Sequence, residues 1–101
     1  MTVIVTGRHM EVSEPLKAYA NEKMSKLVKF LDTVTEIDVV IDAAGKQNIS
    51  VEVIVHAEHR GAFVAKTDHT DAYAAIDLCY AKLERQLTEH KEIHRNRKHP
   101  H

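Results

Sequence analysis

The sequence predicts one α+β domain, in which the elements follow the order β-α-β-β-β-α and two helices pack on one face of a four-stranded sheet. Three observations support this fold class. Two long stretches carry apolar residues at helical spacing, and three consecutive segments between them alternate apolar and polar residues. The length of 101 residues, with 44% hydrophobic and 29% charged residues, suits a single globular domain with an ordinary core.

The first two elements are a short strand and a long helix. Residues 3–6 form a β-branched run ended by Gly7, which is expected to be a turn glycine. Ser13 is followed by an acid and a proline, a combination typical of a helix start. Apolar residues then recur every three or four positions, which predicts a helix to about Leu31; they are Leu16, Ala20, Met24, Leu27 and Leu31.

The next three segments predict an antiparallel meander. Residues 36–42 and 49–57 alternate between apolar and polar side chains, and residues 62–67 form a shorter strand. Turn-forming residues separate them, at 43–48 and 59–61. The alternation directs six side chains toward the core, namely Ile37, Val39, Ile41, Val51, Val53 and Val55. It leaves Asp38, Asp42 and Glu52 on the uncovered face of the sheet.

A second long helix should begin after Thr70 or Asp71, either of which can cap it, and extend to about Ile93. Its apolar stripe consists of Ala72, Ile76, Leu83 and Leu87, widened by Cys79 and Tyr80. We expect residues 1–94 to form the domain and residues 95–101 a short, basic, His-rich tail.

Composition excludes several classes of protein. Cys79 is the single cysteine, so no intrachain disulfide exists, and we expect a small core residue there, not a nucleophile. The sequence shows no secretion signal and no apolar run long enough to cross a membrane, which predicts a cytoplasmic protein without a membrane partner. It contains no Ser/His/Asp set, glycine-rich phosphate loop or Cys-x-x-Cys pair. We therefore expect no enzyme activity and no small-molecule substrate.

Two histidines raise the alternative of a metal site. His90 and His94 lie four residues apart, so they share a helix face as two zinc ligands would. Their possible companions are His99 and His101, in the tail. Because two ligands without a fixed third give only a weak site, we expect no metal and no cofactor.

Positive charge must be clustered if the protein binds nucleic acid, because the net charge is −1. Lys23, Lys26 and Lys29 recur at three-residue spacing on the first helix, and Lys82 and Arg85 on the second. Side-by-side helices could merge these arcs into one basic surface opposite an acidic sheet face. Solvated helix faces explain the same spacing, and periodicity alone does not decide between the two interpretations.

Four segments carry a more specific pattern. They are Asp-Ala-Tyr-Ala-Ala-Ile-Asp at 71–77, Lys-Leu-Glu-Arg-Gln-Leu at 82–87, Glu-Pro-Leu-Lys-Ala-Tyr-Ala at 14–20 and Lys-Leu-Val-Lys-Phe-Leu at 26–31. With the element order, they make the chain resemble the short hibernation promoting factors and ribosome-associated inhibitor A of bacteria, the sigma-54 modulation protein family. The resemblance implies a fold like that of double-stranded-RNA-binding domains.

The resemblance also implies a function. Such proteins bind 16S ribosomal RNA at the decoding region of the small ribosomal subunit, in the channel of messenger and transfer RNA, and block translation in stationary phase or stress. The length favours the short type, which acts with ribosome modulation factor to pair ribosomes. Carried over by position, the residues that contact ribosomal RNA are Arg8, Lys17, Lys23, Lys26, Lys29, Lys82, Arg85 and Lys91. Glu89 departs from the pattern, since a basic residue is common there.

Two alternatives remain. The first is a general RNA-binding module that has the same basic helices but no specific ribosomal site, and the second is a small metal-binding or dimeric interaction protein. Within the matching motif, Asp71 is expected to be a helix cap and Asp77 a first-turn acid near the helix dipole. Tyr73 is expected to pack at the sheet edge with its hydroxyl in water.

Overall fold

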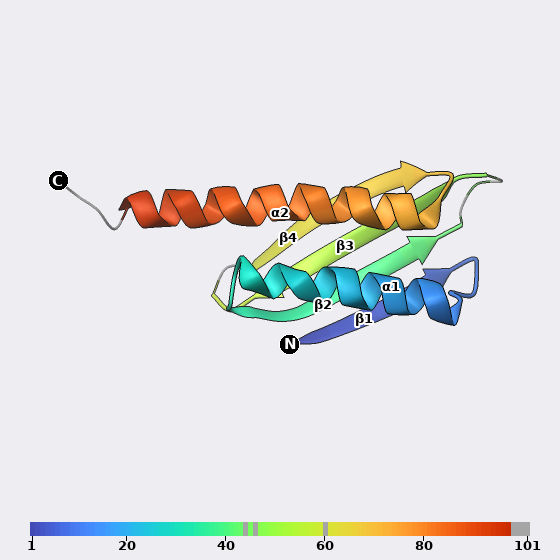
Figure 1. Ribbon diagram of the computed structural model, residues 1–101, viewed down its shortest axis with the longest axis horizontal. Coiled ribbons are helices and arrows are strands. Elements are labelled where there is room, and N and C mark those ends of the chain that lie inside the picture. Colours follow the sequence, from blue (N-terminus) through green and yellow to red (C-terminus); the bar gives the residue numbers. More distant parts are fainter. Residues whose placement is uncertain (44, 46, 60, 98–101) are drawn as a thin grey trace.

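The computed structural model has the predicted fold, a four-stranded sheet with both helices on one face (Figure 1). It describes the backbone of residues 1–43, 45, 47–59 and 61–97, and side chains as far as His90. The elements are β1 (Thr2–Arg8), α1 (Glu14–Ser25), the 3₁₀ helix η1 (Lys26–Lys29), β2 (Val34–Asp42), β3 (Ile49–Ala57), β4 (Gly61–His69) and α2 (Ala72–Arg97). The sheet order is β1-β2-β3-β4, in which β1 runs parallel to β2 and the other pairs are antiparallel.

The predicted turn role of Gly7 is wrong, because Gly7 lies inside β1 and pairs with Ile41 of β2. After Arg8 the chain reverses through His9, whose φ of 58° is in the left-handed region, and brings Met10 back over Gly7. A Cβ at Gly7 would lie 2.6 Å from the Met10 carbonyl oxygen. The glycine is therefore required by a close approach of the backbone.

The first helix begins as predicted and ends differently. The Ser13 hydroxyl accepts a hydrogen bond of 3.3 Å from the Leu16 N–H, which caps α1. The α-helix ends at Ser25, where the prediction had one helix continuing to about Leu31. Its last turn tightens because the Lys26 N–H bonds to the Lys23 carbonyl, and η1 then carries the chain to Lys29.

The hydrophobic core lies between the helix layer and one face of the sheet. The six inward strand residues that alternation predicted are all fully buried. From α1 and η1 the core receives Leu16, Ala20, Met24 and Leu27, and from α2 it receives Ala75, Ile76, Cys79, Leu83 and Leu87. Ala75 is an addition to the predicted stripe. This packing confirms that both helices cover the same apolar face.

The other face of the sheet is uncovered. The register aligns four cross-strand rows on it, among them Thr2–Glu36–His56–Ala62 and Ile4–Asp38–Ile54–Val64. Ile4 and Val64 are 43% and 46% exposed. The predicted outward position of Asp38, Asp42 and Glu52 is confirmed.

The second helix starts at the predicted cap and extends beyond the predicted end near Ile93, to Arg97. The Asp71 carboxylate accepts from the Tyr73 N–H at 2.9 Å, so Asp71 caps α2. The end of α2 runs past the sheet (Figure 1). None of the helices in the described part of the chain combines the length and apolar character that a bilayer crossing requires.

Side chains of α2 also close the outer edge of β4. Lys82 Nζ donates to the Lys66 carbonyl oxygen at 2.9 Å, and Gln86 Nε2 donates to the Val64 carbonyl oxygen at 2.9 Å. Each of these carbonyls points away from β3, where a further strand would otherwise bind.

Candidate nucleic-acid interface

The clearest group of exposed cations lies on α1 and η1. Lys26 and Lys29 are exposed. They are three residues apart in η1, and because a 3₁₀ helix has three residues per turn, their side chains lie on the same side. Lys29 Nζ lies 5.2 Å from the centroid of the Phe30 ring. Within the described residues, the ammonium group of Lys26 has no ion pair and no hydrogen bond. Both lysines are therefore available to an anionic partner.

Lys23 belongs to a polar contact between the two helices. Its Nζ lies 3.5 Å from the Asp77 carboxylate and 5.0 Å from the centroid of the Tyr80 ring. The Tyr19 hydroxyl donates to the same Asp77 carboxylate at 2.5 Å. This hydrogen bond is the main reason that the pKa of Tyr19 is raised above its ordinary value of 10.0.

Asp77 thus differs from its predicted role. It lies beyond the first turn of α2 and accepts from α1, so it connects the helices and is not a partner of the helix dipole. The predicted packing of Tyr73 at the sheet edge is also wrong, because its ring packs edge-to-face on Tyr19 of α1, with centroids 5.1 Å apart. Tyr73 and Asp77, both in the motif at residues 71–77, therefore face α1.

The cations of α2 do not join those of α1 as one continuous arc. Arg85 is exposed and lies on the outward side of α2, whereas Lys82 lies on the opposite flank, over the edge of β4. The flank of α2 that faces α1 carries Asp77, Tyr80 and Tyr73 instead. Lys91 lies in α2, but its side chain is outside the described residues.

The structure separates two further predicted residues from this group. Arg8 pairs with Asp42 in the parallel register and therefore falls on the uncovered face of the sheet. Lys17 is exposed on α1, on the side of the buried stripe away from Tyr19 and Lys23. Of the predicted set, Lys23, Lys26 and Lys29 are brought together, with Arg85 on the neighbouring helix.

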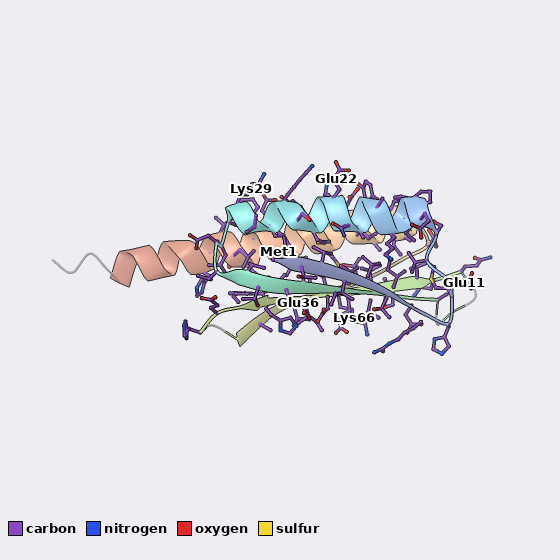
Figure 2. All side chains as sticks on the ribbon, turned by 90° about the horizontal axis from the view of Figure 1, so that it is seen from below. Met1, Glu11, Glu22, Lys29, Glu36 and Lys66 are labelled. Carbon is purple, nitrogen blue, oxygen red and sulfur yellow. The ribbon has the colours of Figure 1, made fainter. Side chains whose placement is uncertain are left out.

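The two faces of the molecule differ in charge. On the helix side, the four lysines of α1 and η1 stand against Glu14 and Glu22, and the described part of α2 adds two cations, Lys82 and Arg85, and three acids, Asp77, Glu84 and Glu89. On the uncovered sheet face, Arg8 and Lys66 stand against five carboxylates, which are Glu36, Asp38, Asp42, Glu52 and Asp68. Figure 2 shows Glu22 and Lys29 on the helix layer and Glu36 and Lys66 on the opposite face. The molecule is therefore polarised despite its near-neutral net charge.

Sequence reasoning missed one cluster of titratable groups. Glu36, Asp38 and His56 lie on the uncovered face, each offering a ligand atom, and these atoms are within 4.8 Å of one another. His56 Nε2 lies 3.0 Å from the Asp38 carboxylate. A hydrogen bond to Asp38, and the charge of Asp38, raise the pKa of Glu36. The carboxylates of Glu36 and Asp38 therefore repel each other when both are ionised.

The other side chains considered for chemistry have structural roles. The His90 ring packs edge-to-face on Phe63, with centroids 5.3 Å apart, and the side chain of His94 lies outside the described residues. Cys79 is fully buried, as predicted, and its thiol donates to Thr67 Oγ1 at 3.4 Å. Burial raises the pKa of this thiol, which keeps it protonated and unreactive.

Comparisons with known proteins agree with this architecture. The model of the family described as Sigma 54 modulation protein / S30EA ribosomal protein matches residues 3–95. The ribosome hibernation promoting factor of Pseudomonas putida is 38% identical over 92 residues, which cover 91% of this chain and 88% of that protein. The factor of the same name from Azotobacter vinelandii is 39% identical over 93 residues, covering 91% of this chain and 84% of that one.

A solved structure shares the fold. The ribosomal subunit interface protein from Coxiella burnetii superposes with a TM-score of 0.82 at 24% identity. The superposition covers 91% of this chain and 99% of that chain.

Proposed function

The chain belongs to the family described as Sigma 54 modulation protein / S30EA ribosomal protein, and from that membership we propose that it is a ribosome hibernation factor that binds the small ribosomal subunit. It occupies the channel of messenger and transfer RNA at the decoding region of 16S ribosomal RNA, and thereby blocks translation in stationary phase or stress. Steric occlusion requires no catalytic group, so the protein acts without enzymatic chemistry, in the cytoplasm.

The observation that carries this proposal is the exposed lysine group of α1 and η1, opposite an acidic sheet face. Lys26 and Lys29 are aligned by the 3₁₀ turn and exposed to solvent, as phosphate contacts require. Arg85 is a further exposed cation, on the outward side of α2. The acidic face would be repelled by phosphate, so the protein approaches RNA with its helix layer.

Co-sedimentation with purified small subunits over a salt series tests the proposal. We expect saturable one-to-one binding that weakens steeply with salt, because each phosphate contact releases counterions. Lys26→Glu should weaken binding and lower the steepness of the salt dependence by about 0.7–0.9 in log–log slope, the value of one contact. Lys26→Glu together with Lys29→Glu should abolish the association without unfolding the protein, whereas Lys82→Glu tests whether the cation over the edge of β4 contributes at all.

Lys66→Glu is the matched control, since it makes the same charge change on the uncovered face. Equal effects of Lys26→Glu and Lys66→Glu would contradict a helix-side interface. Arg8→Glu and Lys17→Glu show whether these two separated residues contribute at all.

Competition experiments distinguish the proposed site from general RNA binding. Transfer RNA and messenger RNA should each displace the protein from small subunits if it occupies their channel. Binding that persists at saturating transfer RNA would favour a general RNA-binding module. Sucrose gradients of ribosomes, with and without ribosome modulation factor, test whether the protein also promotes paired ribosomes.

A further inference from the structure

A surface hollow beside the interhelical contact has the chemistry of a nucleotide site. Its volume is about 160 Å³, and it is lined by Tyr19, Glu22, Lys23 and Lys26. Tyr19, Glu22 and Lys23 lie on one side of α1, and Lys26, the first residue of η1, continues that side. The lining combines an aromatic ring, a carboxylate and two ammonium groups.

The tyrosine ring in this hollow is held in place by α2. The Tyr19 hydroxyl is fixed by its hydrogen bond to Asp77 at 2.5 Å. Tyr73 packs edge-to-face against the same ring at an interplanar angle of 65° and is itself 40% exposed. Tyr19 is partly buried and packs against the hydrophobic core. A partly exposed ring with a fixed orientation is preorganised to stack against a flat ligand.

The charged groups of the hollow favour a nucleotide over a bare phosphate. Lys23 is already paired with Asp77 and lies against Tyr80, whereas Lys26 is exposed. Lys26 can therefore bind a backbone phosphate. Glu22 would repel a phosphate placed beside it, but its carboxylate can accept from the exocyclic amino group of a base.

We propose that this hollow receives one unpaired nucleobase of RNA, stacked on Tyr19, with its phosphate at Lys26. Unpaired bases are recognised by stacking on aromatic side chains, and stacking tolerates any base. This inference rests on the proposed function, because it names the feature of the RNA that the helix layer recognises. The stacked base would add an aromatic contact to the contacts that the lysines make with RNA phosphates.

Ultraviolet crosslinking of the full chain to purified small subunits tests the stacking contact. We expect a crosslink between the peptide containing Tyr19 and one unpaired nucleotide, mapped by mass spectrometry and by reverse-transcription stops. Tyr19→Leu should lose the crosslink and bind roughly 5- to 150-fold more weakly, the range expected for one lost stacked base. Tyr19→Phe should keep the crosslink, because it keeps the ring, and should bind more tightly than Tyr19→Leu but more weakly than the wild type, because it loses the hydrogen bond to Asp77 that orients the ring.

Val64→Ala is the control, because Val64 is 46% exposed on the uncovered face of the sheet, away from the helix layer. It should leave the crosslink and the affinity unchanged. If the wild-type protein fails to co-sediment with small subunits, the proposed function fails and this inference falls with it. If the wild-type protein binds, but Tyr19→Leu binds equally well and no crosslink reaches Tyr19, the stacking site alone is refuted.

Discussion

Removing the Tyr19 hydroxyl should loosen the contact between the two helices by a measurable amount. The perturbation is Tyr19→Phe, which deletes the donor of the 2.5 Å hydrogen bond to Asp77 and keeps the ring. Hydrogen bonds to charged groups contribute about 1.5–3 kcal/mol, but this one is exposed to solvent, so we expect about 1 kcal/mol. For a domain of this size, that loss lowers Tm by about 4–8 °C.

A double-mutant cycle with Asp77→Ala isolates the contact. Asp77→Ala also removes the ion pair with Lys23, whose side chain is 28% exposed, so its own effect should be somewhat larger. The coupling energy between Tyr19→Phe and Asp77→Ala should be about 1 kcal/mol, measured by urea denaturation at pH 7. A coupling energy of zero within error would refute the assigned contact.

The pH dependence provides a second check on the same hydrogen bond. Because the pKa of Tyr19 is raised in the folded protein, chiefly by donation to Asp77, the folded state holds the phenol proton more tightly than the unfolded state. The contribution of this group is complete below pH 10 and is lost as pH rises through the folded pKa. The stability difference between wild type and Tyr19→Phe should therefore shrink above pH 10, and a constant difference would contradict the reasoning.

Three further predictions concern the sheet and the core. Gly7→Ala should destabilise the protein by about 1–3 kcal/mol in urea denaturation, because its Cβ would lie 2.6 Å from the Met10 carbonyl oxygen; an unchanged midpoint would mean that this segment relaxes. Glu36→Gln should raise Tm at pH 7 but not at pH 4. Asp38 raises the pKa of Glu36 in the folded protein, so ionising Glu36 costs stability as pH rises above the ordinary value of about 4.5. Cys79 should react with a thiol reagent only as fast as the protein unfolds, and rapid labelling of the native protein would contradict its burial.

Local patterns were sufficient to predict most elements of the fold. The caps at Ser13 and Asp71 are local hydrogen bonds, so the residue types at the helix starts were enough to locate them. Alternation gave the bounds of β3 and the inward residues of β2 and β3, because the side-chain period of a strand is fixed. The 3₁₀ turn of η1 escaped prediction because the spacing of Leu27 and Leu31 fits continued α-helix equally well.

The candidate site was predictable only in part, because its contacts join distant segments. The lysine group on α1 follows from helical spacing, which is a local property. The contact between Tyr19 and Asp77 joins residues 58 positions apart and depends on how their two helices pack side by side on the sheet. In the same way, Lys82 has the spacing of a basic helix residue, yet its ammonium group bonds to a strand carbonyl, a partner that no periodicity indicates.

The closure of the β4 edge has a consequence for the protein at high concentration. Sheet proteins polymerise when the edge strand of one copy serves as a template for a strand of the next. At β4 an incoming strand would first have to displace the side chains of Lys82 and Gln86 from the Lys66 and Val64 carbonyls. The β4 edge therefore resists fibril growth. Two side chains of α2 protect it from pairing with a strand of another copy.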